Sequence, residues 1–227
     1  AFGSLAALLG VHAVITRSPG AAGLGWITGV LFALLTAHRA GVEIHDLRFV
    51  VFGIAAVLVL APAGIAAIER AALRSPWLWP PLALGLALLP TAVALGVADR
   101  PLLGVIAFGA AAVYLLFGWM VRNGAVALAV AVMVAIGYAH HIEVWHSPFA
   151  EPMVWMPLVG LIAVAAVLAP AHGPFDPLRT ARPGLLAACF GLNALALITS
   201  GSQGATDWVT LATAGVLGIL AAGLRSP

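Results

Sequence analysis

Histidines and carboxylates gather at two places in the sequence, and they are the side chains best suited to chemistry. The two groups are His38, Glu43, His45 and Asp46 and, with its first histidine 102 residues later, His140, His141, Glu143 and His146. Imidazole and carboxylate together can ligate zinc, copper or a haem iron. Their spacing matches no standard ligand motif, and histidine and glutamate are also common at membrane boundaries. Two interpretations follow: a shared metal or haem site, or solvated histidines that order loops. We favour the second, so no cofactor is predicted.

Two further polar residues lie inside apolar runs. His12 stands in the middle of Leu8–Ile15, and Asn193 stands within 184–200. An ionisable group at membrane depth is a functional-site hypothesis by default. The alternative is that His12 lies near an interface or bonds a neighbouring helix. A bis-histidine haem needs a second histidine at similar depth, and the apolar runs contain none, which argues against a cytochrome b. No catalytic residues are predicted, because hydrolase, phosphate-loop and dinucleotide motifs are missing.

The composition excludes a water-soluble fold. Of 227 residues, 63% are hydrophobic and 8% charged, whereas soluble domains have about 45–50% apolar and about 25% charged residues. All ten basic residues are arginine, and the formal net charge is only +2. Without lysine there is no Schiff base or lysine nucleophile, and so small a charge surplus predicts no nucleic-acid partner. The chain is an integral membrane protein.

Continuous apolar runs mark the elements that carry these side chains. A transmembrane helix needs about 20 mostly apolar residues, with a range of about 17–25. Nine segments qualify or nearly qualify, namely 5–16, 21–37, 49–68, 77–97, 101–121, 124–139, 153–171, 184–200 and 206–224. The first is short, so the count is eight or nine. The runs lack the period-two alternation of a membrane β-barrel. The predicted fold is an all-α, polytopic transmembrane helical bundle.

Arginine placement predicts the orientation of the bundle. Loops after the odd-numbered segments hold Arg17, Arg70, Arg74, Arg122, Arg179, Arg182 and Arg225, and loops after the even-numbered ones hold Arg39, Arg48 and Arg100. Short cytoplasmic loops are enriched in arginine. We therefore expect the odd-numbered loops and the C-terminus in the cytoplasm and the histidine-rich loops outside. Arginine-only, alanine- and leucine-rich spans are typical of bacterial membrane proteins, which favours a bacterial inner (plasma) membrane.

The order of the polar residues predicts an internal repeat. Ala37-His38 and Ala139-His140 each close an apolar run, and a glutamate and a second histidine follow. The runs that come next end in Leu-Ala-Pro-Ala, with Pro62 and Pro170 being 108 residues apart. Such order predicts two parallel four-helix repeats, 21–121 and 124–227, with 1–20 as the tail of a preceding repeat. The alternative is convergent membrane composition.

Function is less legible from the sequence than the fold. The favoured hypothesis is a non-enzymatic membrane subunit or scaffold, whose partners are the lipid bilayer and other membrane protein subunits. It rests on missing catalytic motifs and on small-residue faces that let membrane helices approach closely. The first alternative is a transporter or flippase with its pathway between the two repeats. The second alternative is a metal- or haem-binding membrane enzyme that uses the outer histidines.

Overall fold

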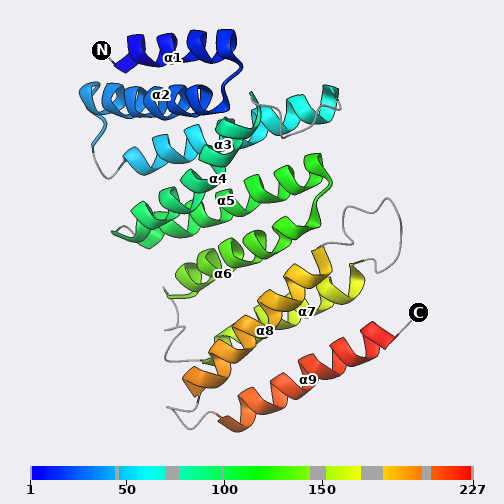
Figure 1. Ribbon diagram of the computed structural model, residues 1–227. Helices are drawn as coiled ribbons and strands as arrows, with labels where there is room; N and C mark the ends of the chain where they lie inside the picture. The colour runs from blue at the N-terminus through cyan, green and yellow to red at the C-terminus, as the bar shows by residue number, and fades with distance from the viewer. Residues whose placement is uncertain are drawn as a thin grey trace. The chain divides into compact units, whose positions relative to one another are not determined.

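The structure is a computed structural model that describes residues 2–43, 46–69, 77–98, 100–143, 152–169, 181–200 and 206–225. In these ranges the regular elements are helices. They are α1 (Phe2–Thr16), α2 (Pro19–Arg39), α3 (Leu47–Glu69), α4 (Trp79–Leu95), η1 (Gly96–Ala98), α5 (Arg100–Val121), η2 (Gly124–Val126), α6 (Ala127–Glu143), η3 (Pro152–Trp155), α7 (Met156–Leu168), α8 (Ala181–Ser200) and α9 (Thr206–Arg225). The all-helical fold expected from the sequence is therefore confirmed over the described residues (Figure 1).

Among the described residues, five helices are long and apolar enough to cross a membrane. They are Pro19–Arg39, Leu47–Ile68, Leu102–Val121, Gly124–His141 and Ala181–Ser200. Four shorter apolar helices accompany them, namely Gly3–Thr16, Trp79–Leu95, Met156–Leu168 and Trp208–Gly223. Apolar side chains as large as Ile68, Trp119 and Leu168 are more than three-quarters exposed on the helices. Such surfaces suit a hydrocarbon environment and make this a membrane protein with transmembrane helices.

Local sequence signals set the ends of α2. Its first turn is capped by Ser18, whose Oγ accepts a hydrogen bond from the backbone N–H of Ala21 at 3.3 Å, and Pro19 occupies the first helical position. Serine before proline is a standard helix start. At the other end, Gly41 has φ of 90° and the N–H of Val42 donates to the carbonyl of Ala37 at 3.1 Å. That is a Schellman motif, which glycine favours because it lacks a Cβ.

Two arginines end helices in the left-handed conformation. Arg17 follows α1 with φ of 51°, and Arg122 follows α5 with φ of 53°. Each precedes a capping side chain: Ser18 before α2, and Asn123, whose Oδ1 accepts from the N–H of Ala125 at 3.0 Å. The left-handed region costs a residue with a Cβ about 1–2 kcal/mol. An arginine in a strained turn therefore stands before α2 and again before η2 and α6. The two arginines are 105 residues apart.

The chain divides into two compact units, Ala1–Val121 and Arg122–Pro227. In unit one α1 packs on α2, α2 packs on α4, and α3 packs on both α4 and α5. The α3–α4 crossing is close at Gly85. A Cβ there would lie 2.8 Å from Leu58 Cβ and 3.0 Å from the carbonyl oxygen of Ala55. Tyr114 ties α5 to α4 by donating from its hydroxyl to the Leu86 carbonyl at 3.2 Å.

Unit two has its own core around α7 and α8. In this unit α6 packs on α8, and α7 packs on both α8 and α9. Cys189 on α8 is buried and its thiol lies 3.8 Å from the carbonyl oxygen of Val159 on α7. Gly184 places α8 against α6, since a Cβ there would lie 3.0 Å from the backbone nitrogen of Leu128. Gly223 on α9 packs directly against the side chain of Val167.

The close helix contacts recur in the two units at nearly constant separation. Gly85 lies against the Ala55 carbonyl in unit one, and Cys189 lies against the Val159 carbonyl in unit two. Cys189 comes 104 residues after Gly85, and Val159 comes 104 residues after Ala55. In unit one α2 meets α4 at Gly23 and Pro80, and in unit two α6 meets α8 at Leu128 and Gly184; the two positions are shifted by 105 and 104 residues. Pro62 and Pro170 are 108 residues apart. This separation is about one helical turn longer than the 104–105 residues between the matching contacts.

Candidate functional sites

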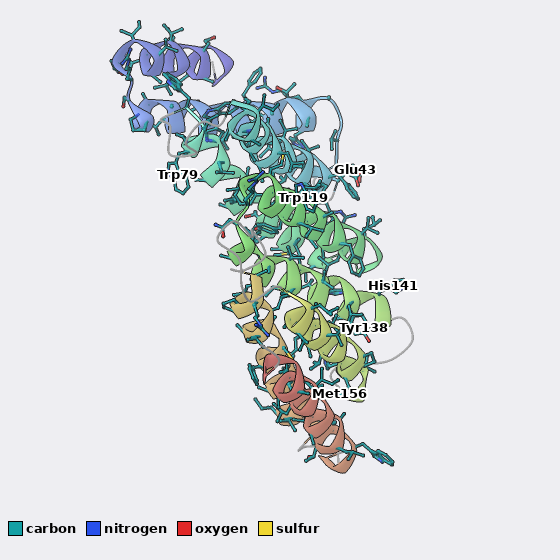
Figure 2. The ribbon with its side chains drawn as sticks, turned by 90° about the vertical axis from the view of Figure 1, so that its right-hand side faces the viewer. Glu43, Trp79, Trp119, Tyr138, His141 and Met156 are labelled. Carbon is teal, nitrogen blue, oxygen red and sulfur yellow. The ribbon has the colours of Figure 1, made fainter. Side chains whose placement is uncertain are left out.

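The first histidine-rich segment forms the connection between α2 and α3. His38 lies exposed on the last turn of α2, and the side chain of Glu43 is also exposed. The Glu43 carbonyl accepts hydrogen bonds from the N–H groups of Asp46 at 3.0 Å and Leu47 at 3.1 Å. This turn therefore leads directly into α3. Figure 2 shows Glu43 at one end of unit one and Trp79 at the other. His45 lies outside the described residues.

The second segment begins on the last turn of α6. His140 is partly buried there, and His141 is exposed and points away from its unit (Figure 2). The backbone of Glu143 ends α6, but its side chain and the whole of His146 lie outside what the structure describes. Within the described ranges, no three histidine, cysteine, aspartate or glutamate side chains come together in a way that could hold a metal ion. The zinc, copper or haem site stays a prediction from the sequence, because the side chains of three candidate ligands, His45, Glu143 and His146, fall beyond those ranges.

The two polar residues inside apolar runs differ in their surroundings. His12 is exposed on α1, and its backbone carbonyl accepts a hydrogen bond from the Thr16 hydroxyl at 2.8 Å. Asn193 on α8 is buried, and its Oδ1 accepts a hydrogen bond from the Thr213 hydroxyl of α9 at 3.0 Å. Interhelical hydrogen bonds of this kind join membrane helices. Asn193 thus has a packing role in unit two, whereas His12 faces outward from unit one.

Arg48 is a residue that sequence reasoning misjudged. It counts as a loop arginine in the sequence, but it belongs to the first turn of α3 and only 1% of its surface is exposed. Its guanidinium carbon lies 5.1 Å from the centroid of the Phe49 ring, within range of a cation–π contact. Its place two residues after Asp46, at a helix start, could have suggested a helical position. Nothing in the sequence indicates that its side chain turns into the unit.

Trp155 is a second residue whose burial the sequence does not indicate. Tryptophans in such a chain suggest anchors at the membrane interface, and Trp79, Trp119 and Trp208 are indeed more than half exposed. Trp155, however, is 4% exposed and packs against Tyr138 with ring centroids 6.2 Å apart. The Tyr138 hydroxyl donates to the Val154 carbonyl at 2.7 Å. This aromatic pair fixes the start of α7 against α6.

The arrangement defines an all-helical membrane protein whose units are held by small, apolar helix contacts. Across the described residues the buried polar or charged side chains are Arg48, Asn193 and Ser200. Ser200 donates to the Leu197 carbonyl at 2.8 Å, as serines in membrane helices do. Comparison with known proteins adds no family: no family model matches the chain, and no curated protein or solved structure is detectably similar to it.

Proposed function

We propose that this protein is a non-enzymatic, multi-pass membrane protein that serves as a subunit or scaffold of a larger assembly. The observation that carries the proposal is the packing of both units. Val59 on α3 and Val159 on α7 are fully buried, and each lies at the crossing with the next helix. Side chains packed in this way leave rigid helical units with broad apolar outer faces. Those outer faces suit contact with lipid and with other membrane helices.

We further propose that the chain contains two tandem repeats of four helices, α2–α5 in unit one and α6–α9 in unit two, with α1 as the last helix of a preceding repeat. Three observations support this. In each proposed repeat the first helix packs on the third and the second helix packs on the third and fourth. The close contacts share a register of 104–105 residues, and a left-handed arginine followed by a capping side chain precedes each repeat. The sequence Arg225-Ser226-Pro227 repeats the residues Arg17-Ser18-Pro19.

The same packing supports eight or nine membrane crossings. The shorter helix α4 lies against the longer helices α2, α3 and α5, and the shorter helix α7 lies against the longer helices α8 and α9. The 3₁₀ turn Gly96–Ala98 extends α4 by three residues, and the turn Pro152–Trp155 precedes α7 directly. With these turns the segments 79–98 and 152–168 have 20 and 17 residues, which reaches the length of about 17 residues or more that a crossing requires.

Solvent access to the interior separates the scaffold from the transporter alternative. We expect the native Cys189 thiol, which is 1% exposed, to react with a small hydrophilic thiol reagent at least about a hundredfold more slowly than an exposed cysteine, because the reagent has no path through packed side chains. The Val59→Cys variant, made in a Cys189→Ala background, tests unit one in the same way. Ala125→Cys, at an exposed position, is the control. Rates close to the control at either interior position would contradict the scaffold and favour a water-filled pathway.

The proposed orientation leads to a separate labelling experiment. In the Cys189→Ala background, Ala40→Cys at the end of α2 should react with an impermeant reagent applied to intact cells. Ala125→Cys, before α6, should react only after the membrane is permeabilised. Both alanines are exposed, so a difference in labelling reports the side of the membrane. The expectation rests on the arginine bias, and the burial of Arg48 removes one charge from the outer loops. Equal labelling at the two positions in intact cells would show that the orientation is wrong.

A further inference from the structure

An open groove runs between α2 and α3 in unit one. Its volume is about 430 Å³, and its walls come from residues 26–33 of α2 and 53–58 of α3. The walls are almost wholly apolar. Trp26 and Leu58 lie toward one end, and Ala33 and Gly53 lie toward the other. The volume falls within the range of about 300–1,000 Å³ that is usual for ligand sites in proteins.

Two glycines keep this groove open. A Cβ atom built at Gly29 or at Gly53 would meet no other atom within 4 Å. These residues therefore differ from Gly85, where a Cβ would collide with α3. Close helix contact is not what places glycine at positions 29 and 53. Glycine also weakens a helix relative to alanine, so helix stability does not account for these two glycines either. Their effect on the structure is the open space that they leave beside α2 and α3.

The position of the groove along α2 corresponds to the hydrocarbon core of a membrane. At 1.5 Å per residue, the 21 residues of α2 span about 31 Å, which matches the roughly 30 Å hydrocarbon core of a bilayer. Residues 26–33 lie in the middle of that length. Ile27 and Leu31 beside them are 45% and 44% exposed, and Val57 on the groove wall is 65% exposed. At this depth such a surface is bathed by lipid acyl chains.

We propose that the groove holds one acyl chain of a bilayer phospholipid, lying along α2 and α3. An elongated, flexible hydrocarbon fits an almost wholly apolar trough, and each buried methylene group contributes to its retention. This inference depends on the membrane location of α2 and α3 and not on the proposed scaffold function. It applies equally to a transporter or an enzyme.

Photo-crosslinking of the full-length protein tests this proposal. The protein is reconstituted in phosphatidylcholine nanodiscs that contain a small fraction of phosphatidylcholine with a photoactivatable acyl chain, and the labelled residues are mapped by mass spectrometry. We expect label to concentrate in 26–33 and 53–58. The Gly29→Leu and Gly53→Leu variants fill the groove, and each should lower this labelling by about tenfold or more, because losing the burial of two or three methylene groups is sufficient for such a change.

Gly191→Leu is the matched control, since Gly191 is exposed on α8, has no atom within 4 Å of its Cβ position and lies outside the groove. It should leave labelling of the groove unchanged. Gel filtration and circular dichroism establish that each variant is folded, and Ala33→Leu replaces any glycine variant that is not. Labelling of the groove no stronger than that of the exposed face of α1 at Leu8, Val14 and Ile15 would overturn the proposal. Equal labelling in the wild type and the groove-filling variants would also overturn it.

Discussion

Replacing Gly85 by alanine is expected to destabilise unit one by about 1–3 kcal/mol, the usual penalty for forcing extra atoms into a packed core. The new methyl group would lie 2.8 Å from Leu58 Cβ, 2.9 Å from Val59 Cγ2 and 3.0 Å from the Ala55 carbonyl oxygen. The Ala55 oxygen belongs to the backbone of α3 and Leu58 Cβ is bonded to it, so these two atoms move only if α3 and α4 separate. Thermal or detergent-induced unfolding of the purified protein measures the effect.

The matched control for this substitution is Gly64→Ala on the neighbouring helix α3. A Cβ at Gly64 would meet no atom within 4 Å, and alanine favours a helix over glycine by up to about 1 kcal/mol. Gly64→Ala should therefore leave stability unchanged or raise it slightly. Equal stability of the Gly85→Ala protein and the wild type would show that α3 and α4 do not approach as closely as the structure describes.

The second large effect is expected where α9 meets α7. A Cβ at Gly223 would overlap both terminal methyl groups of Val167. Valine has a stiff, branched side chain that cannot rotate out of the way. Gly223→Ala should accordingly destabilise unit two, by about 1–3 kcal/mol.

A double-mutant cycle identifies the cause of that loss. Val167→Ala removes the two methyl groups that a Cβ at position 223 would meet, so it should restore much of the stability that Gly223→Ala loses. Coupling energies between contacting residues are typically about 0.5–3 kcal/mol. Unfolding curves of the two single variants and the double variant give the coupling. Strict additivity of the two substitutions would mean that positions 167 and 223 are not in contact.

The positions of the helices could be predicted from the sequence to within a few residues. The apolar segments 21–37 and 184–200 correspond to α2 and α8. The helix α2 extends two residues further at each end, and α8 begins three residues earlier and ends at the same residue. Continuous apolar runs between arginine, proline and glycine carry this information because the membrane imposes a minimum length. The end of α2 is explained by Gly41, whose positive φ completes the cap.

The packing could not be predicted in the same way. Glycines are frequent in most spans, and nothing in the sequence separates Gly85, which lies against α3, from Gly29, which faces open space. The difference depends on which face of each helix meets a neighbour. The buried positions of Arg48 and Trp155 escaped prediction for the same reason, since arginine and tryptophan ordinarily mark interfaces in membrane chains.

The candidate metal-binding residues illustrate a different limit. The sequence predicts His38 and His141 in the loops that follow the apolar segments 21–37 and 124–139, whereas the structure places both on the last turns of α2 and α6, where they are exposed. Whether histidines separated by about a hundred residues meet is a question of tertiary structure, and no local pattern answers it. The scaffold proposal therefore rests on the helix packing within each unit, which is observed among the described residues.

The strained turn at Arg122 also bears on how the protein is made. It lies at the boundary between the two compact units, so every helix that packs within unit one precedes it in the chain. Ribosomes add about 5–20 residues per second, and synthesis of unit two therefore takes roughly 5–20 s after unit one is complete. Helix formation and hydrophobic collapse take about 0.1–100 μs. The helices of unit one can thus form and come together while those of unit two are still being translated.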